Sequence, residues 1–301
     1  MGRRSLSFLT ERNAHATAAR TTAVTDTVVD GEPVTVAHAP GSVTVVFAPA
    51  GTDGSRGISV TTADGVRARV RPAAETVITL NGDGTDFEPV AGVLERLGVT
   101  ARVDLTAETP VGAGFGASGA ATLATALAAN TVCGLDCDRS TLVAAAHRAE
   151  VAAGTGLGDV FVQARGGVVY DTGDGRARRS VTAGSEADGP TVEYVSQGGI
   201  PTASVLDDEA TLDRIRAAAE DAFDAFDPAM SVSELFELGW GFATGTGLVT
   251  DRVRETVDSV ETAGGAATMA MVGETVVATG TDGVLPRRTR LTDRGVRLVD
   301  A

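Results

Sequence analysis

A glycine-rich segment at residues 110–121 is the densest chemical signal in the chain. It reads Pro-Val-Gly-Ala-Gly-Phe-Gly-Ala-Ser-Gly-Ala-Ala, so that glycine recurs at alternate positions. Glycines spaced in this way let the backbone curl until successive N–H groups point into one concavity. An Ala-rich helix is predicted directly after the segment, and the free N–H groups and positive dipole end of its first turn attract anions. The segment therefore predicts a site that holds phosphate groups.

Two carboxylates follow this segment, at Glu150 and Asp159. Glu150 lies late on a predicted helix, and Asp159 follows a second glycine-rich turn nine positions later. Phosphoryl transfer needs charge neutralised on the phosphates, usually by Mg²⁺, and a group that orients or deprotonates the attacking hydroxyl. One carboxylate could serve the metal and the other the hydroxyl. Either residue alone could equally be a surface or capping residue, but the phosphate-binding segment upstream favours the catalytic interpretation.

Three motifs compete for residues 110–121. A Walker P-loop requires a lysine, and the chain contains none. A dinucleotide-binding fingerprint can be spelled with Gly114, Gly116 and Gly119, but it requires a strand that ends at an acidic residue about 20 positions later, and residues 130–138 predict no strand. The pattern Pro-x-Gly-x-Gly-x-Gly-x-Ser-x-Ala resembles the phosphate loop of the GHMP kinases, which include galactokinase, homoserine kinase and mevalonate kinase. The structural alternative is a glycine-rich turn before a close-packed helix.

The resemblance implies ATP and Mg²⁺ as cofactors and assigns roles to individual residues. It implies that Ser118 and Glu150 hold Mg²⁺ and that Asp159 acts on the hydroxyl, which makes these three the expected catalytic residues. The loop departs from the family's common form at Ala117, where a first serine is usual. The residues expected to contact the nucleotide are Pro110, Gly112, Ala113, Gly114, Phe115, Gly116, Ala117, Ser118 and Gly119.

Two further motifs occur in the family's order, Ala-Pro-Gly at 39–41 and a late glycine motif at 264–271. Within the group, the amino-acid sequence at residues 146–151, 155–160 and 269–273 is similar to that of the archaeal pantoate kinases. That likeness implies D-pantoate as the small-molecule substrate and 4-phosphopantoate as the product, a step of archaeal coenzyme A synthesis.

Two departures from the subfamily affect the substrate assignment. Ser42 stands where histidine is frequent, and Asp171 stands where a basic residue is usual. The usual basic residue could bind the substrate carboxylate. In that case Arg56, Arg148 or Arg165 must replace it in this chain, or the substrate differs. The residues expected to contact the substrate are Ser42, Arg56, Arg148 and Thr202. Another GHMP kinase with a different acceptor, and a catalytically silent nucleotide-binding sensor, therefore remain open.

Composition restricts the partners and the compartment. The chain has 40 acidic and 25 basic residues, a formal net charge of -15, and all its basic residues are arginine. Such a surface repels nucleic acid and anionic membranes, so we expect neither as a partner. The pattern resembles proteins of extreme halophiles, although high genomic GC content would also remove lysine codons. Two cysteines cannot build a disulfide framework, and we expect a cytoplasmic protein. Family members are often dimers, so a homodimer is compatible with the resemblance, although no interface pattern is visible.

Hydrophobic periodicity predicts the elements that position these residues. We expect a tight turn at 39–42 between two strands, and a hairpin of 58–62 and 66–70 around Asp64-Gly65. Helices are predicted at 87–97, 118–132 and 139–153, the last capped by Asp138 and ended by Gly154, with a strand at 101–106. Later helices begin near residues 212, 232 and 253, before a hairpin of 268–272 and 275–279.

We expect a disordered extension at 1–33, an N-terminal ATP-binding domain at 34–185 and a C-terminal domain at 190–301, with the glycine-rich stretch 171–189 at the boundary. The resemblance implies an α/β (α+β) GHMP kinase fold, in which a ribosomal protein S5 domain 2-like half precedes a ferredoxin-like half.

Overall fold

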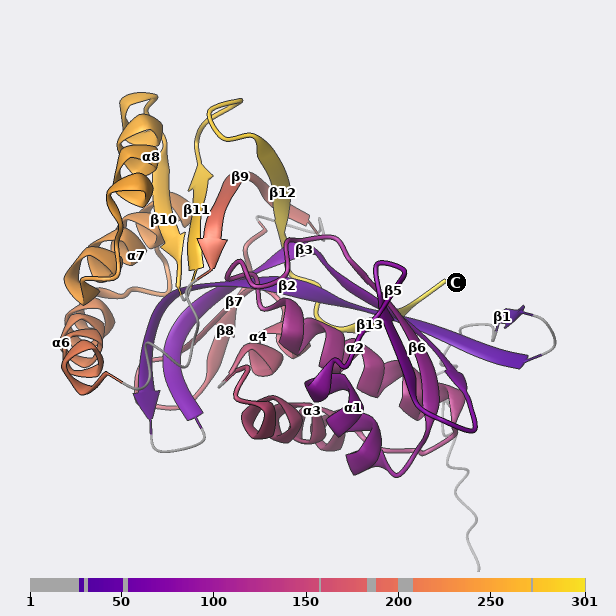
Figure 1. Ribbon diagram of the computed structural model, residues 1–301. Helices are drawn as coiled ribbons and strands as arrows, with labels where there is room; N and C mark the ends of the chain where they lie inside the picture. Colours follow the sequence, from indigo (N-terminus) through magenta and orange to yellow (C-terminus); the bar gives the residue numbers. More distant parts are fainter. Residues whose placement is uncertain are drawn as a thin grey trace, which may run out of the picture.

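The computed structural model describes residues 27–29, 32–50, 54–156, 158–182, 188–199, 208–271 and 273–300. These residues form a mixed α/β fold around one extended, 13-stranded sheet, with helices packed against it at two places (Figure 1). Most of the expected extension at 1–33 lies outside the described residues. Within it, however, Thr27–Val29 form β1, which pairs with the next strand.

Two long antiparallel strands form the spine of the molecule. β2 (Glu32–Ala50) and β3 (Gly54–Pro72) have 19 residues each and pair along their length, spanning the width of Figure 1. The tight turn expected at 39–42 and the hairpin expected around Asp64-Gly65 are therefore wrong, because both lie inside this continuous pair, at a register shift. A Cβ atom on Gly65 would collide with the carbonyl oxygen of Ala39. The glycine thus permits a close approach of two strands and does not make a turn.

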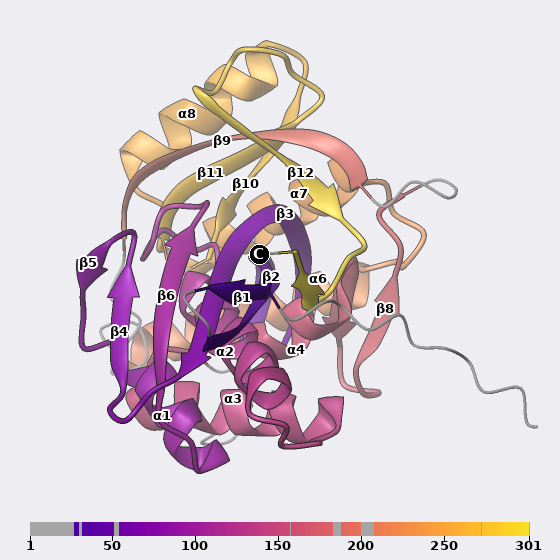
Figure 2. The same ribbon diagram turned by 90° about the vertical axis from the view of Figure 1, so that its right-hand side faces the viewer.

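The first group of helices packs under these strands, as Figure 2 shows. The predictions for three helices and one strand are confirmed to within a residue or two. Asp138 accepts a hydrogen bond from the Thr141 N–H (2.7 Å) and caps α3, which Gly154 ends with a φ of 67°. The elements of this part are β4 (Val77–Leu80), β5 (Asp83–Gly84), α1 (Glu88–Leu97), β6 (Ala101–Ala107), α2 (Ala117–Val132), α3 (Arg139–Ala153) and α4 (Asp159–Arg165).

The second group of helices covers the other end of the sheet, whose strands run in the order β10-β11-β9-β12-β3. The strand β9 precedes these helices. The sequence predicted helices before strands in this part and did not predict β9. The predicted hairpin is present, but each of its two strands begins two residues earlier than predicted. The elements are β9 (Asp188–Gly199), α6 (Glu209–Ala225), α7 (Val232–Thr246), α8 (Asp251–Thr262), β10 (Ala266–Ala270), β11 (Gly273–Thr279) and β12 (Arg287–Thr292). None of the helices among the described residues is long and apolar enough to cross a membrane.

The glycine-rich segment runs between two hydrophobic cores. Ala113 and Phe115 belong to the core that contains the residues of β9, β10 and β11. Ala117 and Ala120, only a few positions later, belong to the core under β3 and β6. Because Val43 and residues 45–48 of β2, together with Ile58 and Val60 of β3, also pack in the first of these cores, the domain division near 185–190 stays a prediction.

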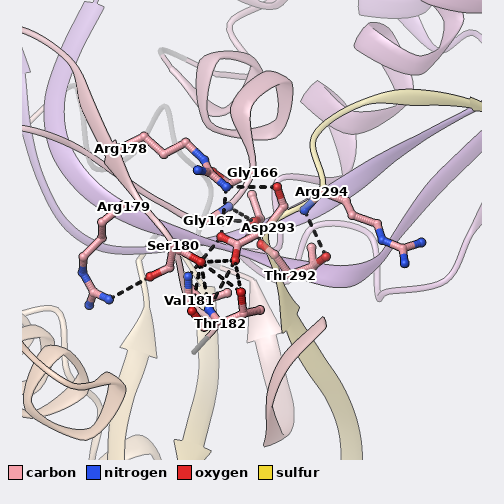
Figure 3. A network of polar contacts seen from close by, with 11 residues as sticks. Gly166, Gly167, Arg178, Arg179, Ser180, Val181, Thr182, Thr292, Asp293 and Arg294 are labelled. Carbon is pink, nitrogen blue, oxygen red and sulfur yellow. Dashed lines mark hydrogen bonds and ion pairs between the residues drawn. The ribbon is translucent and has the colours of Figure 1, made fainter. Parts of the chain in front are cut away.

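Asp293 joins the strand pair after α4 to the turn between β12 and β13 (Arg297–Val299) (Figure 3). That strand pair is β7 (Val168–Asp171) with β8 (Ala177–Arg179). The Asp293 carboxylate accepts hydrogen bonds from Arg178 Nη2 (3.0 Å), the Val181 N–H (3.0 Å), the Thr182 hydroxyl (2.7 Å) and the Ser180 hydroxyl. Although burial opposes it, these bonds hold the pKa of Asp293 below its ordinary value. The carboxylate therefore fastens the segment after α4 to the chain's last strands.

Replacing Asp293 by alanine is expected to destabilise the fold by about 2–3 kcal/mol, because several donors around a largely enclosed carboxylate lose their acceptor. The urea dependence of unfolding measures this loss. Asp282→Ala is the matched control, since its carboxylate is 87% exposed in an ion pair with Arg288, and such pairs contribute little. Equal stabilities of the two variants would contradict the role of Asp293.

Candidate active site

The glycine-rich segment has the alternating curl predicted from its sequence. Gly112, Gly114 and Gly116 adopt φ values of 74°, 82° and 61°, a region that side-chain-bearing residues rarely enter. The intervening Phe115 is completely buried and packs edge-on against Tyr194, with ring centroids 4.8 Å apart. The buried side chains thus anchor the segment, while the glycines supply its curvature.

The segment ends at the N-terminus of α2, with Gly116 as the N-cap and without a side-chain cap. The first turn of an α-helix has N–H groups that lack intrahelical acceptors. Together with the curled backbone before it, this helix end presents main-chain donors and a positive dipole end, which suit phosphate groups.

Glu150 of α3 is buried against the first turns of α2. Its Oε1 accepts hydrogen bonds from the hydroxyls of Ser118 (3.0 Å) and Thr122 (2.6 Å), and its Oε2 accepts one from Thr155 (2.8 Å). Burial raises the pKa of Glu150; the three hydroxyls oppose this shift, and the charge of Asp159 adds to it. Neither Thr122 nor Thr155 was predicted from the sequence, although Thr122 lies four residues after Ser118 and hence on the same helix face.

The oxygen atoms of Ser118 and Glu150 are ligands of the kind that Mg²⁺ takes. Over the described ranges there is no group of three or more His, Cys, Asp and Glu side chains that could hold a metal ion. Mg²⁺ usually keeps waters and binds through one or two carboxylates together with the phosphates of its substrate. The residues present fit that mode of binding.

Asp159 is the first residue of α4 and faces the same site. Its Oδ1 accepts a hydrogen bond from the hydroxyl of the buried Ser42 on β2 (3.0 Å). Burial raises the pKa of Asp159, and the Ser42 hydrogen bond opposes that shift. A Cβ atom added to Gly156 would lie 3.2 Å from Glu150 Oε2 and 3.9 Å from Asp159 Oδ2. The two carboxylates therefore border one glycine and lie in a common site.

The other expected substrate residues are placed differently. Arg56 donates to the carbonyl oxygen of Thr172 (3.1 Å), pairs with Glu220 and lies 5.0 Å from the ring centroid of Phe223. Arg148 is exposed on α3 and, two positions from Glu150, points to the opposite side of that helix. Thr202 lies outside the described residues. Of the four, the structure brings Ser42 into contact with Asp159.

Three comparisons with known proteins bear on this site. Residues 87–167, from α1 to the end of α4, match the GHMP kinases N terminal domain. A pantoate kinase of Methanospirillum hungatei JF-1 is 26% identical over 261 residues, which are 81% of this chain and 86% of that protein. A solved structure described as a phosphotransferase related to the CoA biosynthesis pathway has a TM-score of 0.76 and 20% identity, covering 89% of this chain and 99% of that one.

A further solved structure, described as MDDEF in complex with MVAPP, AMPPCP and magnesium, has a TM-score of 0.62 at 14% identity, covering 89% of this chain and 99% of that one. The resemblance drawn from the motifs is confirmed: the chain has the GHMP kinase fold, and its residues 87–167 match the family's N-terminal domain. Among known members of the group, it is similar to a pantoate kinase.

The substitution Asp159→Asn is expected to stabilise the protein at neutral pH. Because burial raises the pKa of this carboxyl, the folded state binds its proton more tightly than the unfolded state does. The cost of ionisation is absent below the unfolded-state pKa of about 4 and grows as the pH rises through the folded-state value. Asparagine keeps the oxygen that accepts from Ser42 but carries no charge.

Thermal unfolding of wild type and Asp159→Asn between pH 4 and pH 8 measures this effect, with the exposed Asp258→Asn as control. We expect the melting temperatures of wild type and Asp159→Asn to converge towards pH 4 and the variant to melt higher at pH 8. A difference that does not vary with pH would contradict the shift.

Proposed function

We propose that the protein is an ATP-dependent pantoate kinase, which phosphorylates D-pantoate to 4-phosphopantoate. One observation carries the proposal: the glycine-rich segment, the Ser118–Glu150 pair and Asp159 meet at the N-terminus of α2. The identity to a pantoate kinase over most of both chains supports the choice of acceptor.

In the proposed reaction, the pantoate hydroxyl oxygen attacks the γ-phosphorus, the bond from that phosphorus to the β–γ bridging oxygen breaks, and ADP leaves. The main-chain donors of residues 112–119 hold the phosphates. Asp159 orients the hydroxyl and accepts its proton. Ser118 and Glu150 would hold Mg²⁺, which when bound neutralises charge on the β- and γ-phosphates.

For the substrate carboxylate, we propose Arg56 as the cation. β3 pairs with β7 so that Gly57 lies opposite Asp171, which places Arg56 next to the position where the subfamily has a basic residue. The hydrogen bond from Arg56 to Thr172 supports this placement. Arg56 already forms an ion pair with Glu220, however. The alternative is therefore a GHMP kinase that phosphorylates a different small molecule. We also propose Ser42 and Thr202 as contacts of the substrate.

The cellular setting is also a proposal. The acidic, lysine-free composition supports a cytoplasmic protein of a halophilic archaeon, working in concentrated salt. The family resemblance supports a homodimer.

Release of ADP in molar KCl with Mg·ATP, measured with D-pantoate, pantothenate, homoserine, mevalonate or no acceptor, tests the reaction. We expect release with pantoate alone, and Asp159→Ala is expected to lower kcat roughly 10²- to 10⁴-fold. Release with a different acceptor would keep the kinase and discard pantoate. ATP binding without transfer to any acceptor would favour the sensor, and full turnover by folded Asp159→Ala would remove Asp159 from its role.

The salt requirement has its own test. At 0.1 M salt the Debye length is about 10 Å and at 1 M about 3 Å, so repulsion among surface carboxylates falls steeply over this range. We expect the melting temperature and kcat to rise between 0.1 M and 2 M KCl. Values that stay level over that range would favour genomic GC content as the origin of the lysine-free sequence.

A further inference from the structure

Gln163 is a buried polar residue with no role in the site as described so far. It lies on α4, one helical turn after Asp159, and its side chain is completely buried. The spacing of four residues turns both side chains towards β2 and the start of α2. Gln163 Nε2 donates to the carbonyl oxygen of Gly116 (2.7 Å) and to the hydroxyl oxygen of Ser42 (3.3 Å).

These contacts fix the direction of each hydrogen bond. A main-chain carbonyl only accepts, so the amide nitrogen of Gln163 must face Gly116. The same nitrogen has a second hydrogen, which it gives to Ser42. A serine hydroxyl has one hydrogen, and in Ser42 it points to Asp159 Oδ1 (3.0 Å). The result is a one-way relay from Gln163 through Ser42 to Asp159.

Packing alone does not account for a glutamine at this position. Gln163 Oε1 is buried without a hydrogen-bond partner among the described residues. A buried acceptor left without a donor costs stability, and an apolar side chain of the same length would avoid that cost. The space is also tight, because a Cβ atom on Gly119 would lie 2.9 Å from Gln163 Oε1. The amide is thus retained at a cost in stability, at a place where its nitrogen reaches the site.

We propose that Gln163 is a positioning residue for phosphoryl transfer, which holds the Ser42 hydroxyl towards Asp159 and thereby fixes the orientation of the Asp159 carboxylate. The proposal rests on the proposed function, because it takes Asp159 to be the group that acts on the acceptor hydroxyl. Gln163 touches neither nucleotide nor acceptor in this assignment and acts through Ser42.

The variant Gln163→Met tests the proposal, since methionine has a similar length and no hydrogen to donate. We expect kcat to fall roughly 10- to 100-fold, by analogy with the loss of an outer-shell partner of a metal ligand, with little change in KM for the acceptor. Ser42→Ala removes the middle member of the same relay and should cause a similar loss that does not add to that of Gln163→Met. Gln197→Met is the matched control, because Gln197 also donates to a hydroxyl, that of Thr256 (2.7 Å), and also has a buried Oε1 without a described partner.

The decisive comparison repeats Gln163→Met in an Asp159→Asn background, with transfer from γ-labelled ATP measured in single turnovers. If Gln163 acts through Asp159, its substitution then lowers the rate by no more than about twofold. An equal loss in both backgrounds, or wild-type kcat for Gln163→Met, would overturn the proposal.

A spectroscopic measurement separates this proposal from the proposed function. The ¹³C signal of the Asp159 carboxyl is assigned by its disappearance in Asp159→Asn. It should shift in Gln163→Met and stay in place in Gln197→Met, whatever acceptor the enzyme uses. An unmoved signal in Gln163→Met rejects the relay, whereas full turnover by Asp159→Asn rejects the proposed role of Asp159 and leaves the relay's geometry intact.

Discussion

The site depends on how closely α4 approaches the N-terminus of α2. In the proposed site, the main-chain donors that would hold the phosphates lie close to the carboxylate that faces them, so the side chains of α4 leave no room for side chains on the facing turn of α2. Gly116 and Gly119 meet this requirement. A Cβ atom on Gly116 would lie 2.7 Å from Gln163 Nε2, and one on Gly119 would lie 3.3 Å from Asp159 Cβ. Alanine at either position would crowd these side chains, and at Gly116 it would also have to adopt a φ of 61°.

Electrostatics sets a second requirement. The acceptor, the nucleotide and the protein surface are all negative in the proposed reaction, and the loop has no lysine. At the phosphates, the proposed sources of positive potential are therefore main-chain N–H groups, the dipole end of α2 and a bound cation, whereas Arg56 is the proposed cation for the acceptor carboxylate. Burial raises the pKa of both Glu150 and Asp159, so the protein without ligands stores an unfavourable interaction that a cation relieves.

Sequence patterns predicted the local features of this molecule and missed those that depend on distant partners. α3 was predicted with both of its caps because the signals lie within one helix. The Ala-Pro-Gly and Asp-Gly signals were misread as turns, since glycine permits a close strand approach as readily as a turn. Gln163 became meaningful only once folding placed Ser42, 121 positions earlier, beside it. The exposed position of Arg148, by contrast, follows from helical spacing relative to Glu150 and could have been predicted.

Residues 292–296 pack back against α4 and its neighbours, and this has a consequence for folding during protein synthesis. The Gly167 N–H donates to the Thr292 carbonyl (2.9 Å), the Val296 N–H donates to the Gln163 carbonyl (2.9 Å), and Arg139 donates to the Val296 carbonyl (2.8 Å). A ribosome adds about 5–20 residues per second, so α4 emerges several seconds before the segment that holds it. Over that interval the nascent chain contains every proposed catalytic residue and the partners of α4 on α2, α3 and β2, but it lacks the partners in residues 292–296. The hydrogen bonds from residues 292–296 to α4 and its neighbours can therefore form only after that segment has been synthesised.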